Sequence, residues 1–325
     1  MIADTRVVYL FVYVRDLERS REFYERTLGL EVIESDEGCV KFDAGEVILA
    51  LNRAADYGIR LPDGRDNSTD IVFLVDDLAA MQASLEARGL EFIPAVWYSV
   101  GGIADFYDPD GHWLTLYQAS EEALTWPSGQ RISAVMRARE RRNGHRPLVG
   151  PAATKAAESG ELTLAGSELI YVFFFVPDAD EAEVFYHEDL GLRDLEGGPC
   201  SQQTTDDEEG VIKYDTGGVL LTTHFFDGNR SEVEVAEHGC PPRDLDVLHM
   251  KGAAPAFYVR DVQHVVQAIA KKRPGFAPRI SRSQIGVVAT CEDPGGHLFF
   301  LYEPSDEALR LPSGQKIREI LSTPL

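Results

Sequence analysis

The sequence predicts an α+β fold built from four modules of the order strand, helix, three strands. An internal repeat is the main observation. Residues 9–30, YLFVYVRDLERSREFYERTLGL, return without a gap as residues 171–192, YVFFFVPDADEAEVFYHEDLGL. Residues 108–117, DPDGHWLTLY, return as residues 293–302, DPGGHLFFLY. The second observation is the length of 325 residues, which suits two domains of ordinary size.

The repeat divides the chain into two domains and a connection. We expect the first domain to span residues 1–132 and the second to span residues 167–325. Residues 133–166 begin as a helix and then become rich in Ala, Gly, Ser and Thr, which predicts a helical extension followed by a linker. The second copy is longer because of two polar stretches, at 194–210 and at about 225–253, which we interpret as surface loops.

Each copy contains the same module twice. The first module opens with a strand and an amphipathic helix, for which Asp16 is a suitable N-cap and Gly29 a suitable residue after the last turn. Alternating apolar and polar residues then predict three short strands. The order restarts at Asp70, with a strand, a helix closed by Gly89 and three more strands. The predicted strands after the two helices are EVIESDEG, CVKFDAG and EVILALNR, then EFIPAVWY, GIADFYD and HWLTLYQ.

A shared tail, PSGQ, follows the last strand of each copy at residues 127–130 and 312–315. Proline at the first turn with serine as a cap is typical of the start of a helix. Its repetition predicts a terminal helix that is locked onto each domain.

Composition and charge limit the range of functions. The chain has 31 Lys and Arg against 54 Asp and Glu, a formal net charge of −23, so we expect neither nucleic acid nor a membrane as partner. No apolar run approaches the roughly 20 residues of a membrane span, and the first residues do not resemble a secretory signal. The four cysteines are scattered without a CxxC motif, which favours free thiols and a cytoplasmic location.

The paired modules, the V-x-D-L-x-x-S-x-x-FY-x-x-x-LGL opening and the DPDG-H hairpin resemble the vicinal oxygen chelate superfamily. This superfamily includes glyoxalases, extradiol dioxygenases and bleomycin resistance proteins. The resemblance implies two domains in which paired modules form a cupped sheet with the ligand inside. It does not imply one reaction, because a fold of this kind carries several chemistries.

In metal-using members of the superfamily, His, Gln or Glu side chains occupy fixed strand positions. The resemblance places these positions at Tyr9, Ile48 or Ala50, Asp70 and Thr115 in the first copy, and at Tyr171, Leu220 or Thr222, Ala254 and Phe300 in the second. A catalytic divalent metal needs about three hard or imidazole ligands. Neither set provides them, so we expect no metal site and no cofactor.

Strand alternation predicts an aromatic lining for the cups. Functionally, this favours binding of a flat, partly apolar molecule; alternatively, the rings simply fill the cups. The predicted ligand-binding residues are Tyr9, Phe11, Tyr13, Asp70, Trp113, Thr115, Tyr117, Tyr171, His224 and Phe300.

Asp70 is the one carboxylate among the mapped positions and the candidate catalytic residue, as a base or as the partner of a cationic ligand. It could equally cap a turn at the rim of the cup. His112 and His297 fall on the opposite parity, so we expect them to have a structural role. Because Ala254 and Phe300 replace Asp70 and Thr115, we expect the polar pocket in the first domain, with His224 as the main argument for the second.

These observations favour metal-independent binding of a small aromatic or partly apolar metabolite or drug. The alternatives are a lyase or dioxygenase-type enzyme with displaced metal ligands or with Asp70 as base, and a scaffold with filled cups. Whether the protein is an enzyme is left open. A small-molecule ligand is the expected partner, and the chain is expected to be a monomer through pairing of its own domains, or a homodimer.

Overall fold

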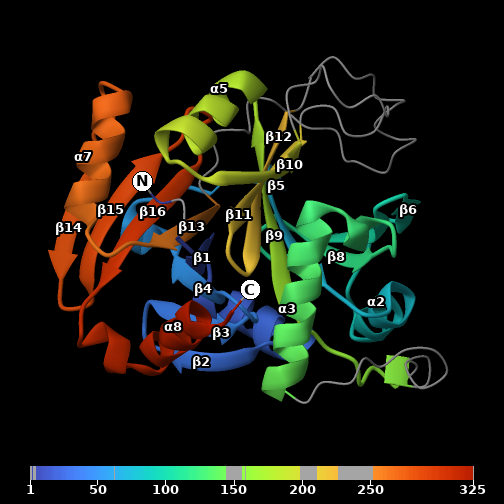
Figure 1. The fold of residues 1–325 in the computed structure, drawn as a ribbon. Coiled ribbons are helices and arrows are strands. Elements are labelled where there is room, and N and C mark those ends of the chain that lie inside the picture. Colours follow the sequence, from blue (N-terminus) through green and yellow to red (C-terminus); the bar gives the residue numbers. More distant parts are fainter. Residues whose placement is uncertain are drawn as a thin grey trace.

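The structure is a computed structural model that describes residues 2, 5–61, 63–143, 156–157, 159–197, 211–225 and 252–324. These residues form two open sheets of eight strands each, with helices packed against them (Figure 1). Four βαβββ modules account for all sixteen strands, so the predicted fold class is confirmed. Much of both predicted insertions, at 198–210 and 226–251, and most of the linker, at 144–155, lie outside the described residues.

The first half of the chain contains modules 1 and 2. Module 1 consists of β1 (Val7–Val14), α1 (Leu17–Glu22) continued by a π-helical turn (Phe23–Thr27), β2 (Glu31–Ser35), β3 (Cys39–Asp43) and β4 (Ile48–Arg53). Module 2, which follows a 3-10 turn (Ala54–Tyr57), consists of β5 (Asp66–Leu74), α2 (Leu78–Ala87), β6 (Val96–Tyr98), β7 (Gly101–Tyr107) and β8 (His112–Ala119). A 3-10 turn (Ala123–Thr125) leads into the terminal helix α3 (Pro127–Asn143).

The second half contains modules 3 and 4. Module 3 consists of β9 (Glu168–Val176), α5 (Ala179–Glu183) continued by a π-helical turn (Val184–Asp189), β10 (Arg193–Gly197), β11 (Val211–Thr216) and β12 (Val219–Phe225). Module 4 consists of β13 (Ala253–Tyr258), α7 (Val262–Lys272), β14 (Arg279–Ser283), β15 (Gly286–Glu292) and β16 (Leu298–Pro304). A 3-10 turn (Ala308–Arg310) precedes the terminal helix α8 (Pro312–Ser322).

The modules pair across the two halves of the chain. One sheet has the order β14-β15-β16-β13-β1-β4-β3-β2 and joins modules 1 and 4; we call it the 1/4 sheet. The other has the order β10-β11-β12-β9-β5-β8-β7-β6 and joins modules 2 and 3; we call it the 2/3 sheet. Figure 1 shows the blue start and the orange-red end of the chain in the same sheet. The sequence analysis had instead placed modules 1 and 2 in one cup and modules 3 and 4 in the other.

The pairing has a simple hydrogen-bonding basis. The first strands of two modules run antiparallel at the centre of each sheet, with β1 beside β13 and β5 beside β9. The first strands of all four modules share an apolar alternation, which does not indicate which pairs form. Contacts between residues far apart in the chain therefore determine which first strands pair.

The outer face of each sheet packs under the helices in one continuous core. Leu10 and Val12 of β1, Phe73 of β5 and Phe174 of β9 belong to this cluster and are completely or almost completely buried. Alternate residues on the same strands point to the opposite face, which lines the cup. The predicted strand alternation therefore assigns the two faces correctly.

A buried aspartate in each DPxGH turn clamps the two modules of each half. Asp108 Oδ2 accepts from the Tyr24 hydroxyl at 3.0 Å, and Asp293 Oδ2 accepts from the Tyr186 hydroxyl at 2.8 Å. The other oxygen of each aspartate accepts from the backbone of its own turn. Since the two modules of a half lie in different sheets, each clamp joins the sheets.

The histidines of these turns have the expected structural role. His112 Nε2 donates to the Tyr13 carbonyl at 2.8 Å, and the ring of His297 stacks on Phe174 with centroids 4.4 Å apart. Both side chains are buried.

The proline, serine and glycine of the PSGQ tail each have a physical role. Both terminal helices begin at the proline, as predicted. The serine does not cap its own helix: the backbone N–H and hydroxyl of Ser128 donate to Glu196 of β10, and those of Ser313 donate to Glu34 of β2. A Cβ on Gly129 would lie 1.8 Å from the Ala123 carbonyl oxygen, so only glycine allows this approach. The tail thus docks each terminal helix on the partner module of its sheet.

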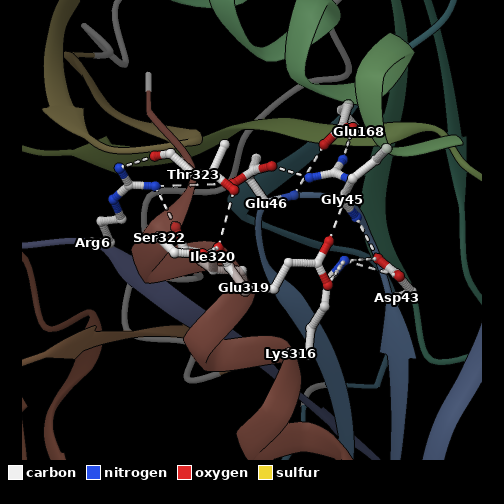
Figure 2. A network of polar contacts seen from close by, with 11 residues as sticks. Arg6, Asp43, Gly45, Glu46, Glu168, Lys316, Glu319, Ile320, Ser322 and Thr323 are labelled. Atoms are coloured by element: carbon white, nitrogen blue, oxygen red, sulfur yellow. Dashed lines mark hydrogen bonds and ion pairs between the residues drawn. The ribbon is translucent and has the colours of Figure 1, made fainter. Parts of the chain in front are cut away.

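A buried charge cluster joins the sheets near the start of β9 (Figure 2). Arg142 of α3 bonds to Glu46 of the β3–β4 turn and, at 2.5 Å, to Glu168 of β9. Glu168 also accepts from the Glu46 backbone N–H at 3.0 Å. Gly45 is required here, because its φ is +85° and a Cβ would collide with the Glu168 carboxylate.

Smaller expectations have mixed outcomes. Asp16 caps α1 as predicted, accepting from the backbone N–H of Glu18 and Arg19. The strand expected over residues 91–98 is shorter, since β6 begins only at Val96. Cys39 and Cys291 are free thiols, and the other two cysteines lie outside the described residues. Among the described helices, none has both the length and the apolar character needed to cross a membrane.

Replacing Tyr24 by Phe tests the clamp. The substitution Tyr24→Phe leaves a buried carboxylate oxygen of Asp108 without its donor, so the free energy of unfolding should fall by roughly 1–3 kcal/mol. Urea unfolding followed by circular dichroism measures this. Tyr57→Phe is the control: it removes a 3.3 Å hydrogen bond to Asn52 from a ring that is 58% exposed, so the loss of stability should be smaller. Equal stabilities of the two variants would contradict a clamping role.

The buried cluster predicts a pH dependence of stability. Burial raises the pKa of Glu168 from 4.5 to about 8, against the opposing effect of Arg142. A raised carboxyl pKa stabilises the fold fully below the unfolded pKa, and this contribution is lost as the pH rises through the folded value. We expect the unfolding free energy to fall between about pH 5 and pH 9 by an amount on the order of 4 kcal/mol.

The variant Glu168→Gln should flatten this dependence, because the amide cannot ionise. Glu319→Gln is the control: its carboxylate lies 3.7 Å from the same arginine but is 42% exposed. A wild-type slope that survives in Glu168→Gln would show that other groups cause it.

Candidate functional site

The predicted ligand-binding residues divide between the two sheets. The inner face of the 1/4 sheet carries Tyr9, Phe11, Tyr13 and Phe300. The inner face of the 2/3 sheet carries Asp70, Trp113, Thr115, Tyr117, Tyr171 and His224. Because the modules pair across the halves, residues expected in one cup now lie in two. Asp70 and His224, expected in different domains, share a cup.

The 1/4 cup is filled by its own side chains. The ring of Phe11 lies 5.2 Å from that of Tyr9 and 5.3 Å from that of Phe300. Ile317 and Ile320 of α8 complete this apolar cluster. Burial raises the pKa of Tyr9 to about 12, which keeps the phenol neutral. The cup therefore has the character of a core.

The 2/3 cup keeps polar residues at the corresponding positions. Strand register places Thr222, Phe173, Asp70, Trp113 and Tyr107 in one row across β12, β9, β5, β8 and β7. The next row contains Leu220, Tyr171, Val72, Thr115 and Asp105. In the 1/4 sheet, Ala254, Phe300 and Thr290 stand where these rows have Asp70, Thr115 and Asp105.

Two carboxylates meet at one hydroxyl in this cup. Thr115 Oγ1 lies 2.9 Å from Asp70 Oδ1 and 2.6 Å from Asp105 Oδ1. All three side chains are buried. The hydroxyl carries a single proton, so it donates to only one carboxylate at a time.

Asp105 was missed in the sequence analysis. The signal was present, because Asp105 interrupts the apolar positions of a predicted strand, between Ala104 and Phe106. It pairs directly with Thr115 on the neighbouring strand β8, and this register only becomes visible in the folded sheet.

Thr222 adds a second polar group to the same face. It is completely buried, and in the described part of the chain its hydroxyl has no hydrogen-bond partner. Phe173 separates it from Asp70 in the row. A buried hydroxyl without a partner is costly, which makes this position one where a bound molecule would be stabilised.

Aromatic rings border the polar groups. The Trp113 and Phe175 rings are stacked, with centroids 5.6 Å apart and an angle of 10° between their planes. His224 lies beside Phe175 at 5.4 Å. Phe173, although central in the sheet, is not fully buried. Phe11, the equivalent residue of the 1/4 cup, is buried to the same degree.

The other end of the cup is closed by α3. Ile132 and Val135 of this helix pack with Tyr117, Tyr171 and Leu220. The Tyr117 hydroxyl donates to the Val100 carbonyl at 2.8 Å, and burial raises the pKa of this phenol. The aromatic and acidic end thus remains as the candidate site.

The metal positions implied by the superfamily do not fit a metal ion. In the 1/4 cup they are occupied by Tyr9, Ile48, Ala254 and Phe300, which offer no carboxylate, imidazole or thiolate. In the 2/3 cup the mapped positions carry one carboxylate, Asp70, and Thr115 contacts both it and the neighbouring Asp105. Over the described residues, no group of three or more His, Cys, Asp or Glu side chains has the arrangement for a metal ion.

Comparisons with known proteins agree with this architecture. Residues 6–116 match the model of the Glyoxalase/Bleomycin resistance protein/Dioxygenase superfamily. Glyoxalase I from Zea mays has a similar fold, with a TM-score of 0.56 and 14% identity, over 98% of this chain and 96% of that one. A variant of the same enzyme has a TM-score of 0.56 and 16% identity, over 91% of this chain and 93% of that one. No curated protein sequence matches the chain.

The identity to these structures is low, so they show the fold alone. The family model covers the first module and most of the second, and the repeat extends the same module to the second half. The resemblance inferred from the DPxGH and FY motifs is therefore confirmed. Residues 6–116 thus match the glyoxalase/bleomycin resistance protein/dioxygenase superfamily, and the repeat continues the same modules through the rest of the chain, where four modules pair into two cupped sheets.

Proposed function

We propose that the protein binds a small, flat, partly apolar molecule in the 2/3 cup, and that no metal ion forms part of the site. One observation carries the proposal: polar groups have been kept in one cup and replaced by apolar ones in the other. A cup maintained only for stability would gain nothing from two carboxylates, since burying charge costs free energy.

The side chains suggest how such a molecule would be held. Phe173 supplies a partly exposed ring as a floor, and the stacked pair Trp113 and Phe175 supplies a wall. Aromatic stacking of this kind contributes roughly 0.5–1.5 kcal/mol for each ring beyond burial of area. Asp70 and Thr222 then give polar contacts on either side of the floor, which would fix the orientation of the ligand.

The 1/4 cup has a supporting role in this proposal. Phe300 and Phe11 occupy the space where the 2/3 cup has Thr115 and Phe173. Burial of one Phe side chain stabilises a fold by roughly 1.5–3 kcal/mol. The filled cup thus contributes stability, while the other cup binds.

Titration with a neutral flat fluorophore tests the proposal. Acridone, followed by fluorescence, should bind at one site per chain. Trp113→Ala should weaken binding by at least about tenfold, because it removes a ring of the wall. Phe300→Ala should leave the affinity nearly unchanged, although both variants should lose stability in urea unfolding. Two equal sites per chain, or a single site lost only in Phe300→Ala, would contradict the assignment of binding to the 2/3 cup.

Elemental analysis tests the absence of a metal. The protein, purified gently and without chelators, should contain no stoichiometric divalent ion, because the described cup positions offer too few ligands. Inductively coupled plasma mass spectrometry of the purified chain is the measurement. About one Fe, Mn, Zn or Ni per chain would contradict metal-independent binding and move the function to metal-dependent enzymes.

A further inference from the structure

We propose that the free edge of β14 is an interaction surface for an extended, acidic segment of a partner protein, which adds to the 1/4 sheet as a further strand. This surface lies outside both cups, so the inference goes beyond the proposed function and does not depend on it. Three observations carry it: the open edge of the sheet, the distribution of charge along the chain, and the difference between β14 and its counterpart β6.

The first observation is that the edge of β14 is open. Among the described strands, β14 pairs only with β15, and it is the last strand of the 1/4 sheet (Figure 1). All five of its residues, Arg279–Ser283, are exposed. An edge strand directs the N–H and C=O groups of every second residue away from the sheet, where a further strand can pair with them. The backbone of β14 therefore offers a template for strand addition.

The second observation is that the chain is basic around β14, although the protein as a whole is acidic. The whole chain has 54 acidic residues and a formal net charge of −23. From residue 262 to residue 291, however, there is no Asp or Glu. The same stretch contains five basic residues, which are Lys271, Lys272, Arg273, Arg279 and Arg282.

The two arginines of β14 itself carry charge that the described residues do not neutralise. Arg273, in the preceding loop, is paired with Glu181 and Asp189. Arg279 and Arg282 are exposed and form no ion pair with any residue that the structure describes. Because they are three residues apart in a strand, their side chains lie on opposite faces of the sheet. A strand that pairs with this edge meets one positive charge on each face.

The third observation comes from the repeat, which supplies an internal comparison. β6 is the corresponding edge of the 2/3 sheet. Trp97 of β6 and Arg282 of β14 are equivalent, because each lies four residues before the glycine that opens the next strand, Gly101 or Gly286. Trp97 is 61% exposed, and its surrounding stretch, residues 78–106, has three acidic residues against one arginine. The two edges have therefore diverged in charge, and only that of β14 is basic.

Charged side chains on an edge strand also prevent uncontrolled pairing between sheets. Charge of either sign serves that purpose, and carboxylates are much the commoner charge in this chain. Arginines repel a basic strand and attract an acidic one, so they select the partner as well as protect the edge. The unpaired backbone groups favour a peptide over nucleic acid or a lipid surface, since only a peptide supplies a complementary backbone. The net charge of −23 also repels a long polyanion.

A cavity of about 570 Å³ lies at the start of β14. It is lined by the loop at 273–278 and by the end of β15, including Phe276, Cys291 and Glu292. Pro278 has no N–H, so β14 cannot extend its pairing with β15 in this direction. We expect a partner strand to place an apolar side chain beside Phe276, because Glu292 disfavours a carboxylate there.

Fluorescence anisotropy with a labelled heptapeptide, Thr-Glu-Val-Thr-Glu-Val-Thr, tests the proposal. Its two glutamates have the spacing of Arg279 and Arg282. It should bind the full-length protein at one site, and the affinity should fall at least about tenfold when salt rises from about 50 to about 500 mM, because exposed charges are screened. The same peptide with lysine for glutamate should not bind. An acidic peptide whose alternate amides are N-methylated should bind at least about tenfold more weakly, because it cannot pair with the edge.

Charge reversal on the protein locates the site. Arg279→Glu and Arg282→Glu should each weaken binding of the acidic peptide at least about fivefold. Arg260→Glu is the matched control, because Arg260 is also exposed but lies in the turn between β13 and α7; the affinity should change less than about twofold. Trp97→Ala, on the counterpart edge, should have no effect. Circular dichroism verifies that each variant is folded.

The other outcomes overturn the inference. No binding of the acidic peptide up to about 1 mM excludes a specific site. Equal binding of the N-methylated peptide makes the surface a general anion patch rather than a strand template. A wild-type dimer that light scattering shows to dissociate in Arg282→Glu places a second copy on the edge. Displacement of the peptide by duplex DNA or by phosphatidylserine vesicles assigns the surface to a polyanion. None of these results bears on binding of acridone in the 2/3 cup.

Discussion

The fold depends on the contact between a buried aspartate and a buried tyrosine in each half of the chain. Asp108 with Tyr24, and Asp293 with Tyr186, join modules that belong to different sheets. Each aspartate also holds the backbone of its own tight turn. Burial raises the pKa of both tyrosines, so they remain neutral donors at any physiological pH. Because an unpaired buried carboxylate is costly, the two modules cannot separate without a large loss of free energy. The clamps therefore hold the two modules of each half together while their strands belong to different sheets.

The terminal helices complete this cross-pairing. Each PSGQ helix starts in one half and donates through its serine to a glutamate on the edge of the partner module, Glu196 or Glu34. For both glutamates burial opposes ionisation, but a neighbouring lysine and the serine bonds hold the pKa below its usual value. Arg142 then ties α3 to both sheets through Glu46 and Glu168 (Figure 2). The terminal helices are therefore docked on both sheets by equivalent serine–glutamate contacts, although the linings of the two cups differ.

This difference in lining links structure to function. In a tandem chain the two cups need not stay equal, because each can change without changing the other. The 1/4 cup has Ala254, Phe300 and Thr290 at the positions where the 2/3 cup has Asp70, Thr115 and Asp105. Apolar substitution stabilises the first cup through burial, while the second retains two buried carboxylates.

The sequence by itself determined the module, its strand and helix order, and the face on which each residue lies. These features depend on local patterns: the alternation of strands, the N-cap Asp16, and the repeat of the FY and DPxGH motifs. It also identified Asp70, Thr115, Trp113 and His224 as residues of an inner face. Only the tertiary structure decided that Asp70 and His224 share a cup, and that Asp105 completes the pair. The reason is that the first strands share the same apolar alternation, so their pairing depends on contacts between residues far apart in the chain, such as that of Thr5 with Tyr258. Such contacts leave no local pattern in the chain.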